Sequence, residues 1–178
     1  VRFDVEVHST KVVLERVRLG QVGLGLLDLS PKDPSNVDVM ELCDASVHCV
    51  MPRDHPLAQF ESVTPALLVD YPILTFPDDT TSNILVREAF RQDNVPCNFI
   101  MTINHSYLAC SLIDLGSGVG LIDEFHLHTD SFPRLTARPF LPTIQLKPTV
   151  VTTAGRMVSL IVGEFIEELR VTAQRIAR

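Results

Sequence analysis

Three short polar segments each follow an apolar run that is typical of a buried strand. They are Pro77 to Asn83, Asn104-His105-Ser106, and Asp123-Glu124. The first two are rich in hydroxyl and amide side chains and precede helical patterns, and a helix N-terminus offers free N–H groups to a carboxylate or another anion. A carboxylate such as Asp123 is suited to an ammonium or guanidinium group. These residue types predict a binding site for a small charged molecule.

Each segment also has a simpler explanation. Asp79, Thr80 or Ser82 would cap the helix that follows, because short polar side chains accept hydrogen bonds from first-turn amides. Asp123 would in the same way cap a helix that begins near Phe125. A cap explains one residue of Pro77–Asn83 but not all of its polar side chains, so both interpretations remain open.

The apolar spacing predicts elements that bring the three segments together. Each segment ends a predicted strand, and a helix ended by Gly116 leads through a glycine turn into the third strand. In open α/β sheets, ligands bind outside the carboxyl ends of the strands. We therefore expect these strand ends to form one rim. The predicted strands are 73–76, 98–103 and 119–122, and the predicted helices are 84–92 and 107–115.

The remaining pattern predicts further α/β structure. Alternation of apolar and polar residues over 1–7 predicts a half-buried strand, followed by a helix capped by Ser9 or Thr10 and ended by Gly20, and by a buried strand within 21–29. Strand, helix and strand in about thirty residues would form a right-handed βαβ unit. Strands are also expected at 37–42, 46–51, 135–140 and 146–153, and helices at 63–68 and 158–176.

Composition limits the classes of function. The 178 residues are 46% hydrophobic and carry a net charge of −7, which does not favour contact with nucleic acid phosphates. The four cysteines lack metal-ligand spacing and are expected to be reduced thiols in a cytoplasmic protein, although one disulfide remains possible. Neither a signal peptide nor a membrane-spanning segment is visible, and the lack of an initiator Met suggests a fragment or a processed product.

The common catalytic motifs are missing from the sequence. It contains no G-x-S-x-G, no Walker glycine loop and no H-E-x-x-H. Gly116-x-Gly118-x-Gly120 follows a helix and enters a strand, which is the reverse of a dinucleotide-binding motif. His126-x-His128 would need further ligands to hold a metal, and neighbouring His105 and Ser106 at a helix start rarely point together. We expect no enzyme activity, no cofactor and no metal.

Several segments, in order along nearly the whole chain, resemble the effector-binding domain of LysR-type transcriptional regulators. They are V-R-L-G-Q-V-G-L-G-L-L (17–27), V-M-P-R-D-H-P-L-A (50–58), Y-P-I-L (71–74), the block from Asn104 to Asp123, and the final strand and helix. The G-V-G-L-I-D-E-F variant is most similar to the branch that regulates opine and basic amino acid metabolism. Asp123 stands where most of the family has proline.

The resemblance implies an α/β fold like that of type II periplasmic binding proteins, with two Rossmann-like lobes joined by two crossing strands. It places lobe I at 1–52 and 146–178 and lobe II at 53–145, with the family's first strand and helix of lobe I absent from this chain. It also implies a cytoplasmic homodimer or homotetramer, without membrane contact, that meets DNA only through a winged helix-turn-helix domain outside this chain.

The resulting hypothesis is a sensor that binds a small-molecule effector, such as an amino acid or an opine-like compound, between the lobes. A transport-type solute-binding protein of the same fold is the alternative, and an enzyme built on this scaffold is a third possibility. The predicted ligand-binding residues are Thr80, Thr81, Ser82, Asn104, His105, Ser106, Asp123 and Phe125.

Overall fold

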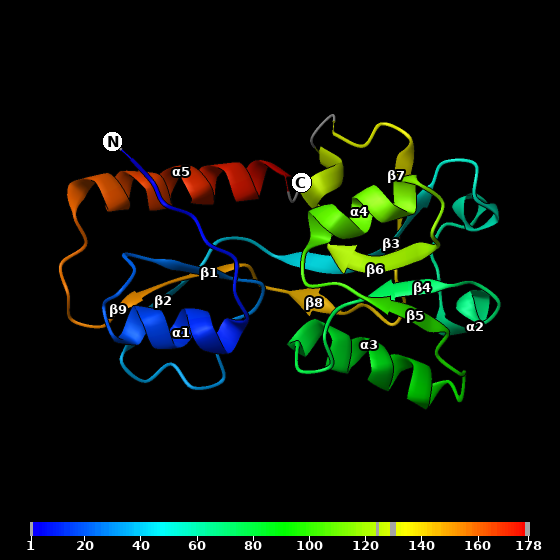
Figure 1. Cartoon of the computed structure of the whole chain (residues 1–178), viewed down its shortest axis with the longest axis horizontal. Coiled ribbons are helices and arrows are strands. Elements are labelled where there is room, and N and C mark those ends of the chain that lie inside the picture. Colours follow the sequence, from blue (N-terminus) through cyan, green and yellow to red (C-terminus); the bar gives the residue numbers. More distant parts are fainter. Residues whose placement is uncertain (1, 124, 129–130, 177–178) are drawn as a thin grey trace. The chain divides into compact units, whose positions relative to one another are not determined.

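A computed structural model describes residues 2–123, 125–128 and 131–176. The chain divides into two compact units (Figure 1). The first comprises residues 1–44 and 147–178, and the second comprises residues 45–146. The strand at 45–52, which the sequence analysis assigned to lobe I, is therefore part of the second unit. The hinged lobes themselves remain a prediction.

The second unit is built on a six-stranded mixed sheet. Strand β4 runs parallel to both of its neighbours, β5 and β6, whereas β3 is antiparallel to β6 and β7. The order is β5-β4-β6-β3-β7, with β8 paired to β3. The strands are β3 (Ala45–Pro52), β4 (Ile73–Thr75), β5 (Phe99–Thr102), β6 (Val119–Asp123), β7 (Leu135–Pro139) and β8 (Gln145–Leu146).

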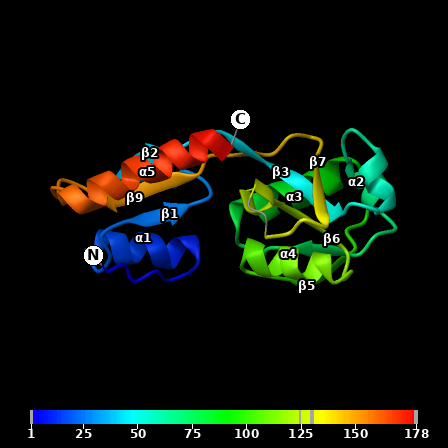
Figure 2. The same cartoon turned by 90° about the horizontal axis from the view of Figure 1, so that it is seen from above.

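Two helices cover opposite faces of this sheet (Figure 2). Helix α4 (Ser106–Asp114) buries Ile113 with Leu74 and Ile122 on one face. Helix α3 (Thr81–Gln92) buries Phe90, whose ring lies 5.7 Å from Phe99. Successive strand residues point to opposite faces, so two covered faces require nearly continuous apolar strands, as in β6. The shorter helices are η1 (Pro56–Gln59), α2 (Pro65–Leu68) and η2 (Phe125–His128).

Two glycines make the turn from α4 into β6. Gly116 has φ +83° just after the helix, a conformation that other residues rarely adopt. Gly118 has φ +139°, and a Cβ there would come within 2.3 Å of the Pro72 carbonyl oxygen. Glycine is thus required at Gly118 both by conformation and by space.

The first unit contains a three-stranded antiparallel sheet in the order β1-β9-β2, with a helix on each face. Helix α1 packs Val17 against Val151, while helix α5 packs Ile166 against the neighbouring residue Val150. The strands are β1 (Gly25–Leu27), β2 (Val37–Glu41) and β9 (Thr149–Thr153), and the helices are α1 (Thr10–Arg18) and α5 (Leu160–Ile176).

The N-terminal segment does not match the sequence-based prediction. Residues 2–8 form no strand, and Val5 is 86% exposed. The Phe3 ring instead lies 5.0 Å from Phe165 of α5, and Glu6 pairs with Arg16 of α1. Alternation shows which side chains could face a core but supplies no partner strand. Because the first strand is missing and β1 pairs only antiparallel, the predicted βαβ unit is also wrong.

Candidate functional site

The three predicted polar segments lie at one end of the second unit's sheet, where β4, β5 and β6 terminate. Because β4, β5 and β6 are parallel neighbours, their carboxyl ends lie at the same end of the sheet. The start of α3 follows β4, the start of α4 follows β5, and Asp123 is the last residue of β6. A backbone hydrogen bond of 2.8 Å from the Ile103 N–H to the Thr75 carbonyl oxygen joins the first two ends. The predicted convergence is therefore present within the second unit.

Asn83 holds the start of α3 against the end of β4. It is 1% exposed, and its Oδ1 accepts a hydrogen bond of 2.6 Å from Thr75 Oγ1. Its Nδ2 donates to the Phe76 carbonyl oxygen at 2.7 Å and to Asp78 Oδ1 at 3.3 Å. The side-chain amide thus fixes both the strand end and the turn that leads into the helix. Asn83 lies in the predicted polar segment 77–83 but is not one of the predicted ligand-binding residues.

The N-terminus of α3 is left open by its own side chains. Thr80 is the N-cap residue, but its hydroxyl donates to the Pro77 carbonyl oxygen at 2.8 Å and makes no cap hydrogen bond. Thr81 is exposed and Ser82 is half-buried. Among the residues that the structure describes, no side chain therefore bonds to the first-turn N–H groups of α3, and such groups attract an anion. The expected side-chain cap by Asp79, Thr80 or Ser82 is not formed.

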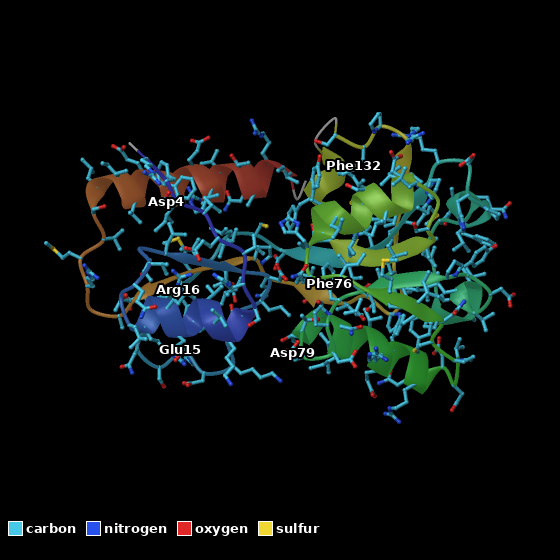
Figure 3. All side chains as sticks on the ribbon, viewed as in Figure 1. Asp4, Glu15, Arg16, Phe76, Asp79 and Phe132 are labelled. Atoms are coloured by element: carbon cyan, nitrogen blue, oxygen red, sulfur yellow. The ribbon has the colours of Figure 1, made fainter. Side chains whose placement is uncertain are left out.

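Acidic groups close to this helix start are partly neutralised. Asp78 Oδ1 accepts a hydrogen bond of 2.6 Å from Arg87 Nη2, and the Arg87 guanidinium lies 4.6 Å from the centre of the Phe99 ring. Figure 3 shows Asp79 at the turn before α3, where its side chain is exposed. An incoming anion would therefore meet the paired carboxylate of Asp78 and the exposed carboxylate of Asp79.

The N-terminus of α4 is closed by comparison. His105 is the N-cap residue, and its Nδ1 accepts a hydrogen bond from the Tyr107 N–H at 3.3 Å. Ser106 Oγ donates to Asp123 Oδ2 at 2.8 Å. Because Ser106 and His105 have different partners, they do not form a nucleophile–base pair.

Asp123 both caps η2 and faces α4. Its Oδ1 accepts from the Phe125 N–H at 3.1 Å, so the alternative role as a helix cap is confirmed. Among the described residues, no Lys, Arg or His side chain forms an ion pair with it. Burial, together with the nearby Asp123 carboxylate, raises the pKa of the Cys110 thiol to about 12. Within the described part of the chain, the Asp123 carboxylate thus has hydrogen-bond donors but no cationic partner. Glu124, its predicted acidic neighbour, lies outside the described residues.

The remaining predicted ligand residues, Asn104 and Phe125, differ in exposure. Asn104 is exposed, and Phe125 is half-buried beside Asp123. Neither of two hollows on the second unit, of about 650 and 420 Å³, is lined by any predicted ligand residue. The predicted residues therefore share a sheet edge but do not line these hollows.

Aromatic residues at this edge were missed by sequence reasoning. Phe76, which is labelled in Figure 3, directly follows β4. It packs against the core cluster that contains Ile103. Phe132 is 8% exposed, and its ring lies 5.0 Å from Tyr107 at the start of α4. Phe76 could have been noted because it ends an apolar run, whereas Phe132 stands between turn residues and gave no periodic signal.

The described residues contain no group of three His, Cys, Asp or Glu side chains that could hold a metal ion. The side chains of His126 and His128 lie outside what the structure describes. All four cysteines are free, with Cys49 and Cys110 buried and Cys97 exposed. No helix of the described chain is long and apolar enough to cross a membrane.

The two α/β units, with a mixed sheet whose parallel strand ends carry polar helix starts, define a periplasmic-binding-protein-like fold. The model of the LysR substrate-binding domain matches residues 1–174, so the chain belongs to this family. The fold class and the family predicted from sequence are confirmed, whereas the opine and basic amino acid branch is not.

Two comparisons with solved structures support the fold. The QuiR effector-binding domain in complex with shikimate superimposes with a TM-score of 0.71 at 14% identity, over 94% of this chain and 79% of that one. The BenM effector-binding domain with its effector benzoate gives a TM-score of 0.68 at 21% identity, over 92% of this chain and 77% of that one.

In sequence, the chain is similar to regulators that are considerably longer. It is 28% identical over 113 residues to the Hca operon transcriptional activator HcaR of Escherichia coli, which covers 62% of this chain and 38% of that protein. Across the first curated relatives, the matched stretch spans 29 to 40% of their length.

Proposed function

We propose that this chain is the effector-sensing domain of a LysR-type transcriptional regulator. The family match and the curated relatives, which are regulators, support this role over a transport-type solute-binding protein. With a net charge of −7, the chain itself is a poor partner for DNA phosphates. DNA contact would therefore be made by a helix-turn-helix domain outside this chain, in a cytoplasmic homo-oligomer.

The effector would bind at the carboxyl ends of the parallel strands β4, β5 and β6. The observation that carries this proposal has two parts: α3 begins without a side-chain cap after β4, and β4 is the parallel neighbour of β6, which ends at Asp123. Among the described residues, Asp123 has hydrogen-bond donors but no ion-pair partner. The N–H groups of α3, with Thr80, Thr81 and Ser82, would hold a carboxylate. Shikimate and benzoate, the ligands of two structural neighbours, are both carboxylates.

Asp123 would select for a second group. A carboxylate that lacks a cationic partner favours an ammonium or guanidinium group, so the effector would carry both an acidic and a cationic group, as amino acids and opines do. Asn104, His105, Ser106 and Phe125 border this position. Binding would change DNA binding only if the effector has unequal affinity for two conformations of the regulator.

Calorimetry on the full-length regulator tests this assignment. A panel of basic amino acids is titrated alongside benzoate, which lacks a cationic group. The variant Asp123→Asn keeps an oxygen for the Phe125 N–H but removes the charge. We expect it to weaken binding of the amino acid ligand about tenfold, or about 1.4 kcal/mol, and not to weaken binding of a purely anionic ligand.

Asp70→Asn is the matched control, because Asp70 is exposed on the second unit and the substitution makes the same change of charge. Unchanged affinity of Asp123→Asn for every cationic candidate would remove Asp123 from the site.

A further inference from the structure

A second cluster of charged side chains lies away from the strand ends described above. It lines the hollow of about 650 Å³, and every lining residue belongs to the second unit. Because β3 is antiparallel to β6, the end of β3 at Pro52 lies at the sheet edge opposite to Asp123. The hollow is thus separate from the proposed effector site. Its lining residues are Arg53, Asp54, His55, Pro56, Ala58, Gln59, Thr136 and Arg138.

Arg138 places a fixed positive charge at this hollow. Its Nη2 donates to the Ala58 carbonyl oxygen at 2.7 Å, and its Nε donates to the Phe60 carbonyl oxygen at 2.9 Å. Its Nη1 donates to the Ala137 carbonyl oxygen at 2.9 Å and to Thr136 Oγ1 at 3.3 Å. All of these acceptors are neutral, so they orient the guanidinium without cancelling its charge.

Arg53 adds a second guanidinium. Its Nε donates to the Pro133 carbonyl oxygen at 2.8 Å, and its backbone N–H donates to the Arg134 carbonyl oxygen at 2.9 Å. In the part of the chain that the structure describes, no carboxylate forms an ion pair with Arg53 or Arg138. The hollow thus holds two guanidinium groups that have no carboxylate partner among the described residues, in a chain with a net charge of −7.

His55 supplies a neutral donor beside them. Its Nδ1 accepts from the Leu57 N–H at 3.2 Å, so in the neutral ring the hydrogen is on Nε2. The ring packs 4.8 Å from Tyr71, and burial lowers the pKa of His55 although the Asp54 charge opposes the shift. Asp54 is the one acidic residue in the lining, and it is exposed.

We propose that this hollow is a second binding site, for a small oxyanion such as phosphate, sulfate or the carboxylate of a metabolite. Arg53 and Arg138 supply the charge, and His55, Gln59 and Thr136 supply neutral polar groups. The hollow lies within the size range of small-molecule sites and is larger than a single phosphate needs. The remainder would take the uncharged part of an anionic metabolite.

The test is an NMR titration of the full chain with inorganic phosphate, at constant ionic strength maintained with chloride. We expect saturable shifts at the backbone amides of residues 53–59 and 136–138, with a dissociation constant on the order of 1 mM. Sodium sulfate should compete for the same signals.

Two variants with opposite expected signs make the test specific. Arg53→Gln should weaken phosphate binding about fivefold, because a charge-assisted hydrogen bond is lost. Asp54→Asn should strengthen binding, because it removes the acidic group of the lining. Arg91→Gln is the control: Arg91 is an exposed residue of α3 with the same charge, and its loss should leave binding unchanged.

Three results would overturn the proposal. One is the absence of saturable shifts at 53–59 and 136–138. A second is equal weakening by Arg91→Gln, which would indicate non-specific charge attraction. The third is a response confined to residues 81–83, which would assign phosphate binding to the strand-end site alone.

Discussion

The two strand-to-helix junctions of the second unit look alike in sequence but differ in structure. Both follow a parallel strand and both carry hydroxyl groups. At α3, the Thr80 hydroxyl bonds back to Pro77 and leaves the helix start open. At α4, His105 caps the helix and Ser106 is held by Asp123. Polar residue types thus predict where a ligand could bind, whereas hydrogen-bond partners determine which junction is still free to bind one.

The largest expected effect is the loss of the support beneath the open junction. Asn83→Ala removes three hydrogen bonds and leaves the buried Thr75 hydroxyl without its acceptor. We expect the free energy of unfolding to fall by about 2–3 kcal/mol, because an unsatisfied buried polar group is costly. Urea unfolding measures this change.

Asn98→Ala is the control for this variant. Asn98 is exposed and donates a single bond of 3.1 Å to the Tyr71 carbonyl oxygen, so its loss should cost less than about 1 kcal/mol. Equal destabilisation by the two variants would show that the Asn83 network does not support the open junction.

The next effect concerns the closed junction at alkaline pH. The folded pKa of Cys110 is about 12, above the ordinary value of 9.0, so the folded state retains a proton that the unfolded state loses. The stability contributed by this thiol is therefore complete below pH 9 and is lost as pH rises toward 12. When the pH is raised from 8.5 to 10, the free energy of unfolding of the parent protein should fall by up to about 1 kcal/mol more than that of Cys110→Ala.

Urea unfolding at a series of pH values measures this difference. Cys97→Ala is the control, because that thiol is exposed and should alter the pH dependence less. Parallel pH profiles for the parent and Cys110→Ala would contradict the assignment of Cys110 to a dry, negatively charged environment.

The smallest change in stability comes from closing the open junction. Thr80→Asp places a good cap acceptor where the native hydroxyl points away, and should raise the free energy of unfolding by about 0.5–1 kcal/mol. The same carboxylate would occupy the proposed anion position, so effector affinity should fall by at least about tenfold.

Thermal unfolding and calorimetry check the two expectations for Thr80→Asp together. His105→Asp is its counterpart at the closed junction, where one cap replaces another, and stability should change by less than about 0.5 kcal/mol. A similar gain from both substitutions would mean that the two helix starts are not different.

Sequence reasoning predicted most of the second unit because its elements are locally determined. The apolar run of β6 is short and buried. It follows a tight turn in which position 118 must be glycine. The carboxyl ends of β4, β5 and β6 could therefore be placed at one end of the sheet from the sequence pattern alone. The alternation of Val1, Phe3, Val5 and Val7 wrongly predicted a strand, because a strand also needs a partner strand, which a local pattern cannot supply.

The sequence predicted that the three polar segments share one end of the sheet, but not how their side chains are bonded, and ligand binding there stays a prediction. Both roles of Asp123 were considered, and the cap was found, whereas its bond with Ser106 spans 17 positions and has no local signature. The role of Asn83 was missed because its partners, Thr75 and Phe76, become neighbours only after the turn is formed. Periodicity reports burial, but it does not report which polar groups satisfy one another.

The most direct test of the effector site is an NMR titration of the full chain with a carboxylate ligand identified by calorimetry. We predict that the largest saturable shifts occur at the backbone N–H groups of residues 81–83, and that Thr80→Asp abolishes them while His105→Asp does not. Shifts that instead centre on the α4 helix start, and that survive Thr80→Asp, would contradict the claim that the open junction receives the ligand.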